Sequence, residues 1–282
     1  MAKKISQLGQ LLRTAIASGD KIPILDQSAG QTKYVTVGDL VGLPDFGWTA
    51  SGEAWSYSAW SSTTRIAEVT VPTDATTKYQ PGMRVKFTQS TGGTKYGIVM
   101  KVEATKLHIL VPVGITFNNE TLTDIFYSGE YAPFGFDSSP ANWALEFTDN
   151  SNRLQASPAL NTWYNPGSQS LTIGVGKYKL SYSANVYMNH NSSATGTIHV
   201  ILHTANNSGS TSSKFYRRLY ATLNAGSSFA LIGAVYAEDD VGVASSTQTY
   251  YLNALCDYAS AGNVGFWNSQ GKSVIKAIPA YL

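Results

Sequence analysis

Two histidines four residues apart are the first residues in this chain whose spacing could bind a metal ion. His199 and His203 have the spacing that places two ligands on one face of a helix, but residues 198–203 (Ile-His-Val-Ile-Leu-His) are typical of a β-strand. Four residues of strand separate the two rings by about 13 Å, which is too far for one ion to bind both. The sequence predicts two ordinary strand histidines and no metal site. A threefold axis that joined copies of one histidine is the alternative.

Two charged clusters could bind a ligand or each other. The acidic run of Glu238, Asp239 and Asp240 lacks the regular ligand spacing of a calcium loop, so a solvated turn between strands explains it. The basic cluster combines cations with interleaved aromatic side chains: Lys214, Phe215, Tyr216, Arg217, Arg218 and Tyr220. It could contact a phosphate-bearing polymer, or it could form a salt bridge with the acidic run of a neighbouring copy.

The carboxylates do not define a catalytic pair. Hydrolysis of a glycosidic bond needs two carboxyl groups that face each other across a cleft. Besides the acidic run, the available groups have no spacing that singles out two of them: Asp137, Glu146, Asp149 and Asp257. The chain also has no Gly-Xaa-Ser-Xaa-Gly motif, no phosphate-binding loop and no Cys/His zinc pattern. We expect a protein that is not an enzyme and that needs no cofactor.

Aromatic residues near predicted turns could bind sugar rings. Trp163, Tyr164 and Trp267 carry flat side chains, and sugars present apolar faces that stack on such rings. Packing in a core or at a subunit interface is the alternative, and it is the interpretation we favour. Together with Tyr216 and Arg217, these three residues form the set of candidate binding residues.

The composition indicates a globular protein with a polar but mostly uncharged surface. Hydrophobic residues make up 43% of the 282 residues, but charged residues only 13%, against the usual share of about a quarter. Such a surface suits a β-protein packed into an assembly, because unpaired charges are costly to bury between subunits. The net charge of +2 favours neither nucleic acid nor an anionic membrane as a partner.

Three features that the sequence lacks indicate the cellular compartment in which the chain folds. Cys256 is the one cysteine of the sequence, so no intrachain disulfide can form, and we expect it to be a small buried side chain. No stretch approaches the roughly 20 apolar residues of a membrane span, so no membrane insertion is expected. The N-terminal residues do not resemble a signal peptide. We expect synthesis in a cytoplasm.

Residues 1–44 predict a short amphipathic helix followed by a hairpin. The apolar residues of the helix fall on one face: Ile5, Leu8, Leu11, Leu12 and Ile16. The hairpin strands are predicted at 21–26 and 32–36. A segment with so little apolar content cannot form its own core and must dock on something else. We interpret it as an attachment segment, with a plain N-terminal extension as the alternative.

Residues 45–136 predict a small β-barrel or sandwich that serves as a spacer or docking module. The strands are predicted at 65–72, 84–89, 97–102 and 107–112.

Residues 137–282 predict a head domain in the form of an antiparallel, two-sheet jelly roll, so the chain as a whole is expected to be all-β. The predicted strands are 170–175, 178–188, 196–204, 215–221, 229–236, 247–256, 264–267 and 274–280. Within residues 178–188, apolar and polar side chains alternate, which predicts a half-buried strand.

The middle module resembles a module of tail and appendage proteins of tailed bacteriophages. The resemblance depends on an ordered set of landmarks: Trp48, Trp55-Ser56-Tyr57, Val71-Pro72, Tyr79-Gln80-Pro81-Gly82-Met83-Arg84, Thr94-Lys95-Tyr96-Gly97, Tyr127-Ser128 and Pro133-Phe134-Gly135-Phe136. The N-terminal block is similar to the opening of many phage fibre proteins, through Ile5-Ser6-Gln7-Leu8, Ile22-Pro23-Ile24 and residues 33–40. Residues 273–282 resemble the last strand of trimeric heads of the C1q and tumour-necrosis-factor type.

These resemblances imply a homotrimeric tail or head fibre in the virion. The N-terminal segment would attach to other virion proteins of the tail, baseplate, portal or capsid, and the head would bind a host-surface glycan or polymer with the help of trimer avidity. The alternative is a purely structural baseplate, neck or capsid-decorating protein without a host receptor. A glycan-cleaving tailspike is a third, less favoured class.

Overall fold

The computed structural model describes residues 21–26, 31–36, 47–190, 194–223, 229–257 and 261–282, and they are almost entirely β-structure. The all-β prediction is confirmed. The predicted helix with Ile5, Leu8, Leu11, Leu12 and Ile16 lies outside the described residues. No helix in the described part of the chain is long and apolar enough to cross a membrane.

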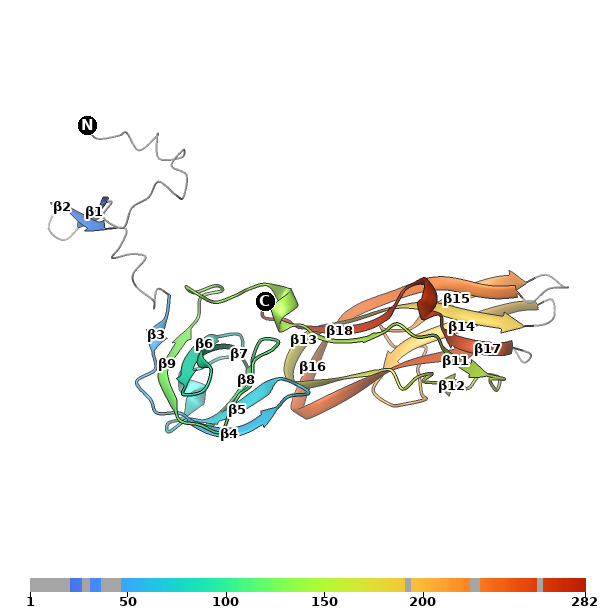
Figure 1. The fold of residues 1–282 in the computed structure, drawn as a ribbon, viewed down its shortest axis with the longest axis horizontal. Helices are drawn as coiled ribbons and strands as arrows, with labels where there is room; N and C mark the ends of the chain where they lie inside the picture. Colours follow the sequence, from blue (N-terminus) through green and yellow to red (C-terminus); the bar gives the residue numbers. More distant parts are fainter. Residues whose placement is uncertain (1–20, 27–30, 37–46, 191–193, 224–228, 258–260) are drawn as a thin grey trace, which may run out of the picture.

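The N-terminal hairpin forms as predicted. Strand β1 (Lys21–Asp26) pairs antiparallel with β2 (Gln31–Thr36), with Lys21 opposite Thr36 and Asp26 opposite Gln31. This two-stranded sheet has no strand-to-strand pairing with the rest of the described chain, and Figure 1 shows it apart from the other two sheets.

The middle module is a curled seven-stranded antiparallel sheet, shown in blue and green in Figure 1. Its strands are β3 (Thr49–Ala50), β4 (Ser56–Ser61), β5 (Ile66–Thr70), β6 (Arg84–Gln89), β7 (Gly93–Glu103), β8 (Lys106–Leu110) and β9 (Leu122–Ser128), in the order β3-β9-β6-β7-β8-β5-β4. A 3-10 turn, η3 (Ala75–Thr77), connects β5 to β6. The four predicted strands match β5 to β8, whereas β3, β4 and β9 were not predicted. Figure 1 shows the sheet curling round on itself, which encloses a core of its own around Phe87 and Phe117.

The C-terminal part is a sandwich built from one nine-stranded sheet that folds back on itself. After the short helix α2 (Pro140–Trp143), its strands are β10 (Leu145–Asp149), β11 (Arg153–Ala156), β12 (Trp163–Tyr164), β13 (Ser170–His190), β14 (Ala194–His203), β15 (Arg217–Leu223), β16 (Phe229–Cys256), β17 (Ala261–Phe266) and β18 (Ser273–Pro279). A 3-10 turn, η4 (Asn268–Gln270), precedes β18. The prediction of an antiparallel two-layer jelly-roll fold is confirmed.

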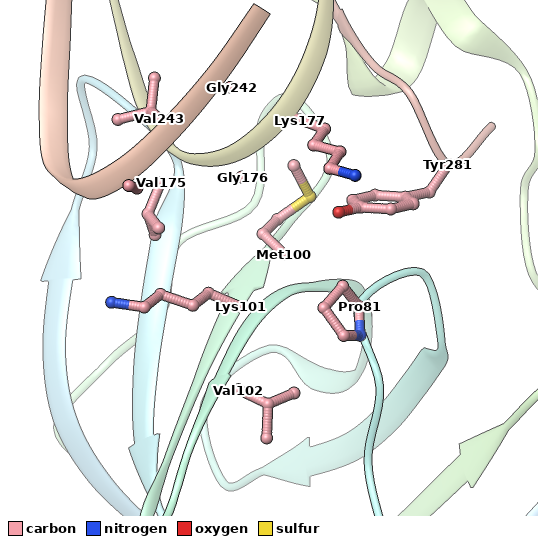
Figure 2. Close-up of a pocket in the computed structure, with 11 residues that line it drawn as sticks. Pro81, Met100, Lys101, Val102, Val175, Gly176, Lys177, Gly242, Val243 and Tyr281 are labelled. Carbon is pink, nitrogen blue, oxygen red and sulfur yellow. The ribbon is translucent and has the colours of Figure 1, made fainter. Parts of the chain in front are cut away.

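Strands β13 and β16 run through both layers of the sandwich. In what we call layer 1, residues 176–190 of β13 pair with residues 229–243 of β16, and β10, β11, β17 and β18 extend the sheet. In layer 2, residues 170–174 of β13 pair with residues 247–251 of β16, joined by β12, β14 and β15. Both strands bend where they pass from one layer to the other, as Figure 2 shows.

This continuity corrects two predictions. The segments 170–175 and 178–188 are one strand, and so are 229–236 and 247–256. The acidic run therefore lies in β16 and not in a turn: Asp239 is opposite Leu180 of β13. Local sequence missed this because polar residues in a strand with one solvent-facing side resemble the residues of a loop.

The two layers enclose the main core. On β13 the predicted alternation is confirmed, since the buried residues are Tyr178, Leu180, Tyr182, Ala184, Val186 and Met188. Across the layers, the sulfur atoms of Met188 and Cys256 are 3.4 Å apart, and the Tyr182 hydroxyl donates to the carbonyl of Phe215 at 3.0 Å. Cys256 is buried, as predicted.

The middle module and the sandwich share hydrophobic packing. Ile66, Ile98 and Met100 from the module belong to the same core cluster as Ile173 and Tyr178 of β13. The contact is closest at Gly176, which has φ +128° and would place a Cβ atom 2.6 Å from Met100. A side chain at that position would clash and strain the backbone, so glycine allows both the bend and the contact.

Two arginines add hydrogen bonds across this junction. Arg84 of β6 is 2% exposed and donates to the carbonyls of Gly82 (2.5 Å), Tyr131 (3.1 Å) and Tyr281 (2.9 Å). Arg65, which has φ +53°, donates to carbonyl oxygens of the α2 segment, including that of Trp143 at 2.7 Å. Burial lowers the pKa of both guanidinium groups, but arginine starts so high that both stay charged. The module is thus fixed to the head by specific contacts.

Candidate functional site

Two of the candidate binding residues, Trp163 and Tyr216, converge on His199 in layer 2. The Tyr216 hydroxyl is 2.5 Å from Nδ1 of His199, and the Trp163 ring contacts the imidazole edge-on with 6.4 Å between centroids. On the other side, Nε2 of His199 is 3.4 Å from Oδ2 of Asp257. Asp257 is held in turn, because its Oδ1 accepts the Thr197 amide at 2.7 Å.

This cluster offers several hydrogen-bonding groups. Burial raises the pKa of Tyr216, so its phenol stays protonated near neutral pH. Asp257 is exposed, while His199 is largely covered. Sequence analysis named Asp257 as one of several carboxylates but could not pair it with His199, because 58 positions separate them and only the β14–β16 pairing brings them together.

The other side chains of this region have structural contacts. Trp163 and Tyr164 are both half-buried, in keeping with the packing interpretation favoured for them. Gly209 lies so close to the Trp163 ring that a Cβ atom there would be 2.5 Å from it, and the Tyr164 hydroxyl accepts the Ala159 amide at 2.9 Å. Each ring therefore has at least one side occupied by its own chain, as expected from the packing alternative.

The basic cluster divides into bound and available cations. Arg217 donates to the carbonyls of Tyr236 (2.9 Å), Lys214 (3.0 Å) and Tyr216 (2.7 Å), which secures the start of β15 against β16. Arg218 is exposed and stacks over the Tyr220 ring at 4.7 Å. Phe215 is buried. Lys214 and Arg217 are exposed as well, and Arg218 is the arginine not committed to these backbone carbonyls.

The acidic run is paired within its own chain. Lys214 is 2.9 Å from Asp239, and Lys179 is 3.0 Å from Glu238. The pKa of Glu238 is lowered by hydrogen bonds from Tyr236 and Lys179, and that of Asp239 by Lys214. Among the described residues there is no group of three or more His, Cys, Asp or Glu side chains placed to hold a metal ion.

Trp267 lies on the opposite side of the head, on the outer face of layer 1. Its indole stacks on Tyr187 with 4.5 Å between ring centroids and 18° between the planes. Its backbone amide donates to the Asn185 carbonyl at 2.8 Å. Trp267 is thus about the full width of the sandwich away from the His199 cluster, and the five candidate residues do not form one site.

A mainly apolar groove lies at the junction of module and head (Figure 2). It has a volume of about 420 Å³, with Met100 beneath the bend of β13 and Val175 and Val243 on one side. Tyr281 and Lys177 line the other side. The groove is not recognisable in the sequence, because its residues come from distant segments that meet only in the folded chain.

Comparison with known proteins adds little to this geometry. No protein-family model matches the chain, and no curated protein matches it. Among solved structures it is similar to the VP2 subviral particle of infectious bursal disease virus, with 9% identity, a TM-score of 0.28 and coverage of 92% of this chain and 64% of that chain. It is also similar to the structure of the Gx strain of the same virus, with 10% identity, a TM-score of 0.28 and coverage of 91% of this chain and 64% of that chain. The chain thus spans 64% of the length of these structures, and likeness at this TM-score supports no functional argument.

Proposed function

We propose that this chain is a virion appendage protein of a tailed bacteriophage, a homotrimeric tail or head fibre. Residues 1–44 would attach it to other virion proteins, residues 45–136 would act as a spacer, and the head at residues 137–282 would bind a host-surface glycan or polymer. The proposal combines the sequence resemblances with an all-β head that shares a hydrophobic core and hydrogen bonds with the middle module. The observation that carries it is the character of the outer face of layer 1.

This outer face is a sheet surface with exposed apolar groups. Ile232 and Tyr236 of β16 are 47% and 56% exposed; Ile232 is opposite Tyr187, which stacks on Trp267, and Tyr236 is opposite Ser183. Val274, on β18, extends the surface and is opposite Ser183. Contiguous exposed apolar groups of this kind mark surfaces that bind another protein.

The charges on this face are arranged so that it can be buried. Lys179 pairs with Glu238 at 3.0 Å, and Lys276 pairs with Glu146 at 3.5 Å. Paired charges cost less to remove from water than single ones. A surface that is neutral and apolar suits a second copy of the same chain. Since the last strand resembles those of trimeric heads, a closed threefold ring is the assembly we propose.

The oligomeric state tests this surface directly. We expect light scattering after size-exclusion chromatography to give a mass of three 30.3 kDa chains at micromolar concentration. Tyr236→Glu should shift the mass to that of a monomer, because each interface would have to bury a new, unpaired charge. Tyr220→Glu is the matched control, since Tyr220 is 58% exposed but lies on the outer side of layer 2. A monomeric wild type, or equal loss of trimer in both variants, would refute the interface.

Binding to the host separates the fibre from the structural alternative. We expect fluorescently labelled protein to sediment with cells of the bacterium on which the phage grows, and to be displaced by polysaccharide extracted from those cells. The candidate contacts are Trp163, Tyr164, Tyr216, Arg217 and Trp267. We expect no release of sugar from the envelope. Absence of binding, together with failed assembly of particles that lack the protein, would favour a baseplate, neck or capsid-decorating role.

A further inference from the structure

A second, smaller cavity lies on the other side of the junction between the middle module and the head. It has a volume of about 140 Å³ and is less open than the apolar groove. Its walls come from β4, β5, β8 and the bend of β13 and β16. The polar residues among its lining are Ser61, Thr64, Glu68, His108, Ser246 and Thr247. This lining differs from that of the apolar groove, although both include Val175.

His108 lines this cavity and has one ring nitrogen without a hydrogen-bond partner. Its side chain is 10% exposed, and Nε2 is 3.3 Å from Oε1 of Glu103. The other ring nitrogen, Nδ1, is buried and has no hydrogen-bond partner in the described structure, since Oε1 of Glu68 is 3.5 Å away without suitable geometry. An unsatisfied buried polar atom costs about 1 to 3 kcal/mol. Nδ1 is covered by protein atoms, so its nearest acceptor is the Glu68 carboxylate 3.5 Å away.

The remaining groups match a ring that bears hydroxyl groups. Trp60 supplies an indole surface to the wall, and four hydroxyl groups line the rest. Glu68 provides a carboxylate that accepts hydrogen bonds, while its charge is compensated by Lys106 at 2.9 Å. The cavity therefore has no excess charge that would select an ionic ligand. A cavity of about 150 Å³ holds one six-membered ring such as benzene, so this one has the size for a single ring.

We propose that this cavity binds one neutral hexose unit, with the Trp60 indole against the sugar ring and with Glu68 and the lining hydroxyls bonded to its hydroxyl groups. The inference rests on the proposed glycan-binding function and places a sugar-binding site at the junction, away from the five candidate residues on the outer faces of the head. Because the walls come from both parts of the chain, the site exists only when module and head are joined.

The experiment uses the full chain and defined sugars. Glucose and galactose are titrated while saturation-transfer NMR reports the bound sugar, with glucuronate as a charged control. We expect saturable binding of at least one neutral hexose in the millimolar range and weaker binding of glucuronate. Thr247→Val and Ser246→Ala, each at an exposed position of the cavity rim, should weaken hexose binding about fivefold, the equivalent of one lost hydrogen bond. Thr70→Val, exposed in β5 and outside the cavity, should bind as the wild type does.

Two outcomes would overturn the inference: no saturable binding of either hexose, or unchanged binding by both rim variants. The hexose binding of His108→Phe is also compared with that of the wild type, after circular dichroism has established that this variant folds. The result is separable from the fibre proposal. Host-cell binding that survives in both rim variants would leave the fibre proposal intact while this site fails. Hexose binding without any host-cell binding would support this site and count against the fibre proposal.

Discussion

Replacement of Arg84 by alanine is expected to lower the free energy of unfolding by about 3 to 5 kcal/mol, as is typical when a buried charged group loses its interactions. The side chain is 2% exposed and donates to three carbonyl groups, those of Gly82, Tyr131 and Tyr281. Alanine would leave these acceptors unpaired in the protein interior and would open a cavity beside Phe136, which lies 4.9 Å from the guanidinium carbon.

The position of Arg84 makes this loss relevant to function. Tyr281 is at the C-terminal end of the head, whereas Gly82 and Tyr131 belong to the middle module. We therefore expect urea unfolding of Arg84→Ala, followed by tryptophan fluorescence and circular dichroism, to show an earlier transition for both parts of the chain. If the module and head separate, the slope of the transition should also change, since less surface is then exposed in a single step.

Two control variants define what the Arg84 result means. Arg84→Lys keeps a positive charge, but a single ammonium group cannot reach three carbonyls that lie in different directions. This variant should therefore lose an intermediate amount of stability. Arg218→Ala removes an exposed cation that stacks on Tyr220 and should cost no more than about 0.5 kcal/mol. A loss in Arg84→Ala as small as that of Arg218→Ala would show that the junction does not depend on this arginine.

Replacement of Trp143 by alanine should have a comparable effect, about 3 to 5 kcal/mol. Trp143 ends the short helix α2 and is fully buried. Its ring stacks on Phe136 at 5.0 Å, its indole donates to the Asp137 carbonyl at 2.6 Å, and its own carbonyl accepts Arg65. One side chain thus holds the connection between module and head through packing and hydrogen bonding together.

Trp143→Phe should retain the stacking with Phe136 but lose the hydrogen bond to Asp137, at a cost of about 1 to 2 kcal/mol. Phe134→Ala is the exposed control. Its side chain is 51% exposed, and the Trp48 indole bonds to its backbone carbonyl, which the substitution keeps. Denaturant midpoints measure all three variants. If Trp143→Ala were no less stable than Phe134→Ala, the connection would not depend on this residue.

Much of the fold could be predicted from local patterns. The bounds of β6 match the prediction, because residues 84–89 are bordered by glycine-containing turns. The alternation over residues 178–188 was also sufficient to identify which side chains are buried. The short strands β3, β11 and β12 were missed, because two to four residues carry too little periodicity to be recognised.

The candidate site was less accessible to prediction than the fold. Trp163 and Tyr216 were named for their ring types, but their contacts with His199 depend on which strands lie side by side. His108 was not among the predicted site residues, although it lines a cavity and has an unpaired ring nitrogen. No signal in the sequence around His108 distinguishes it from any other strand histidine, because the groups that surround it come from other strands.

The sequence by itself determined that this chain is a β-protein with an amphipathic long strand, one buried cysteine and no recognisable catalytic motif. Those properties depend on neighbouring residues, whose alternation and turn chemistry act over a few positions. Only the tertiary structure decided that β13 and β16 bend through both layers, that the acidic run is paired within the chain, and that module and head share a core. These features depend on contacts between residues up to 197 positions apart, such as Arg84 with Tyr281. The spacer of the sequence analysis is therefore also one wall of the cavity to which we assign sugar binding.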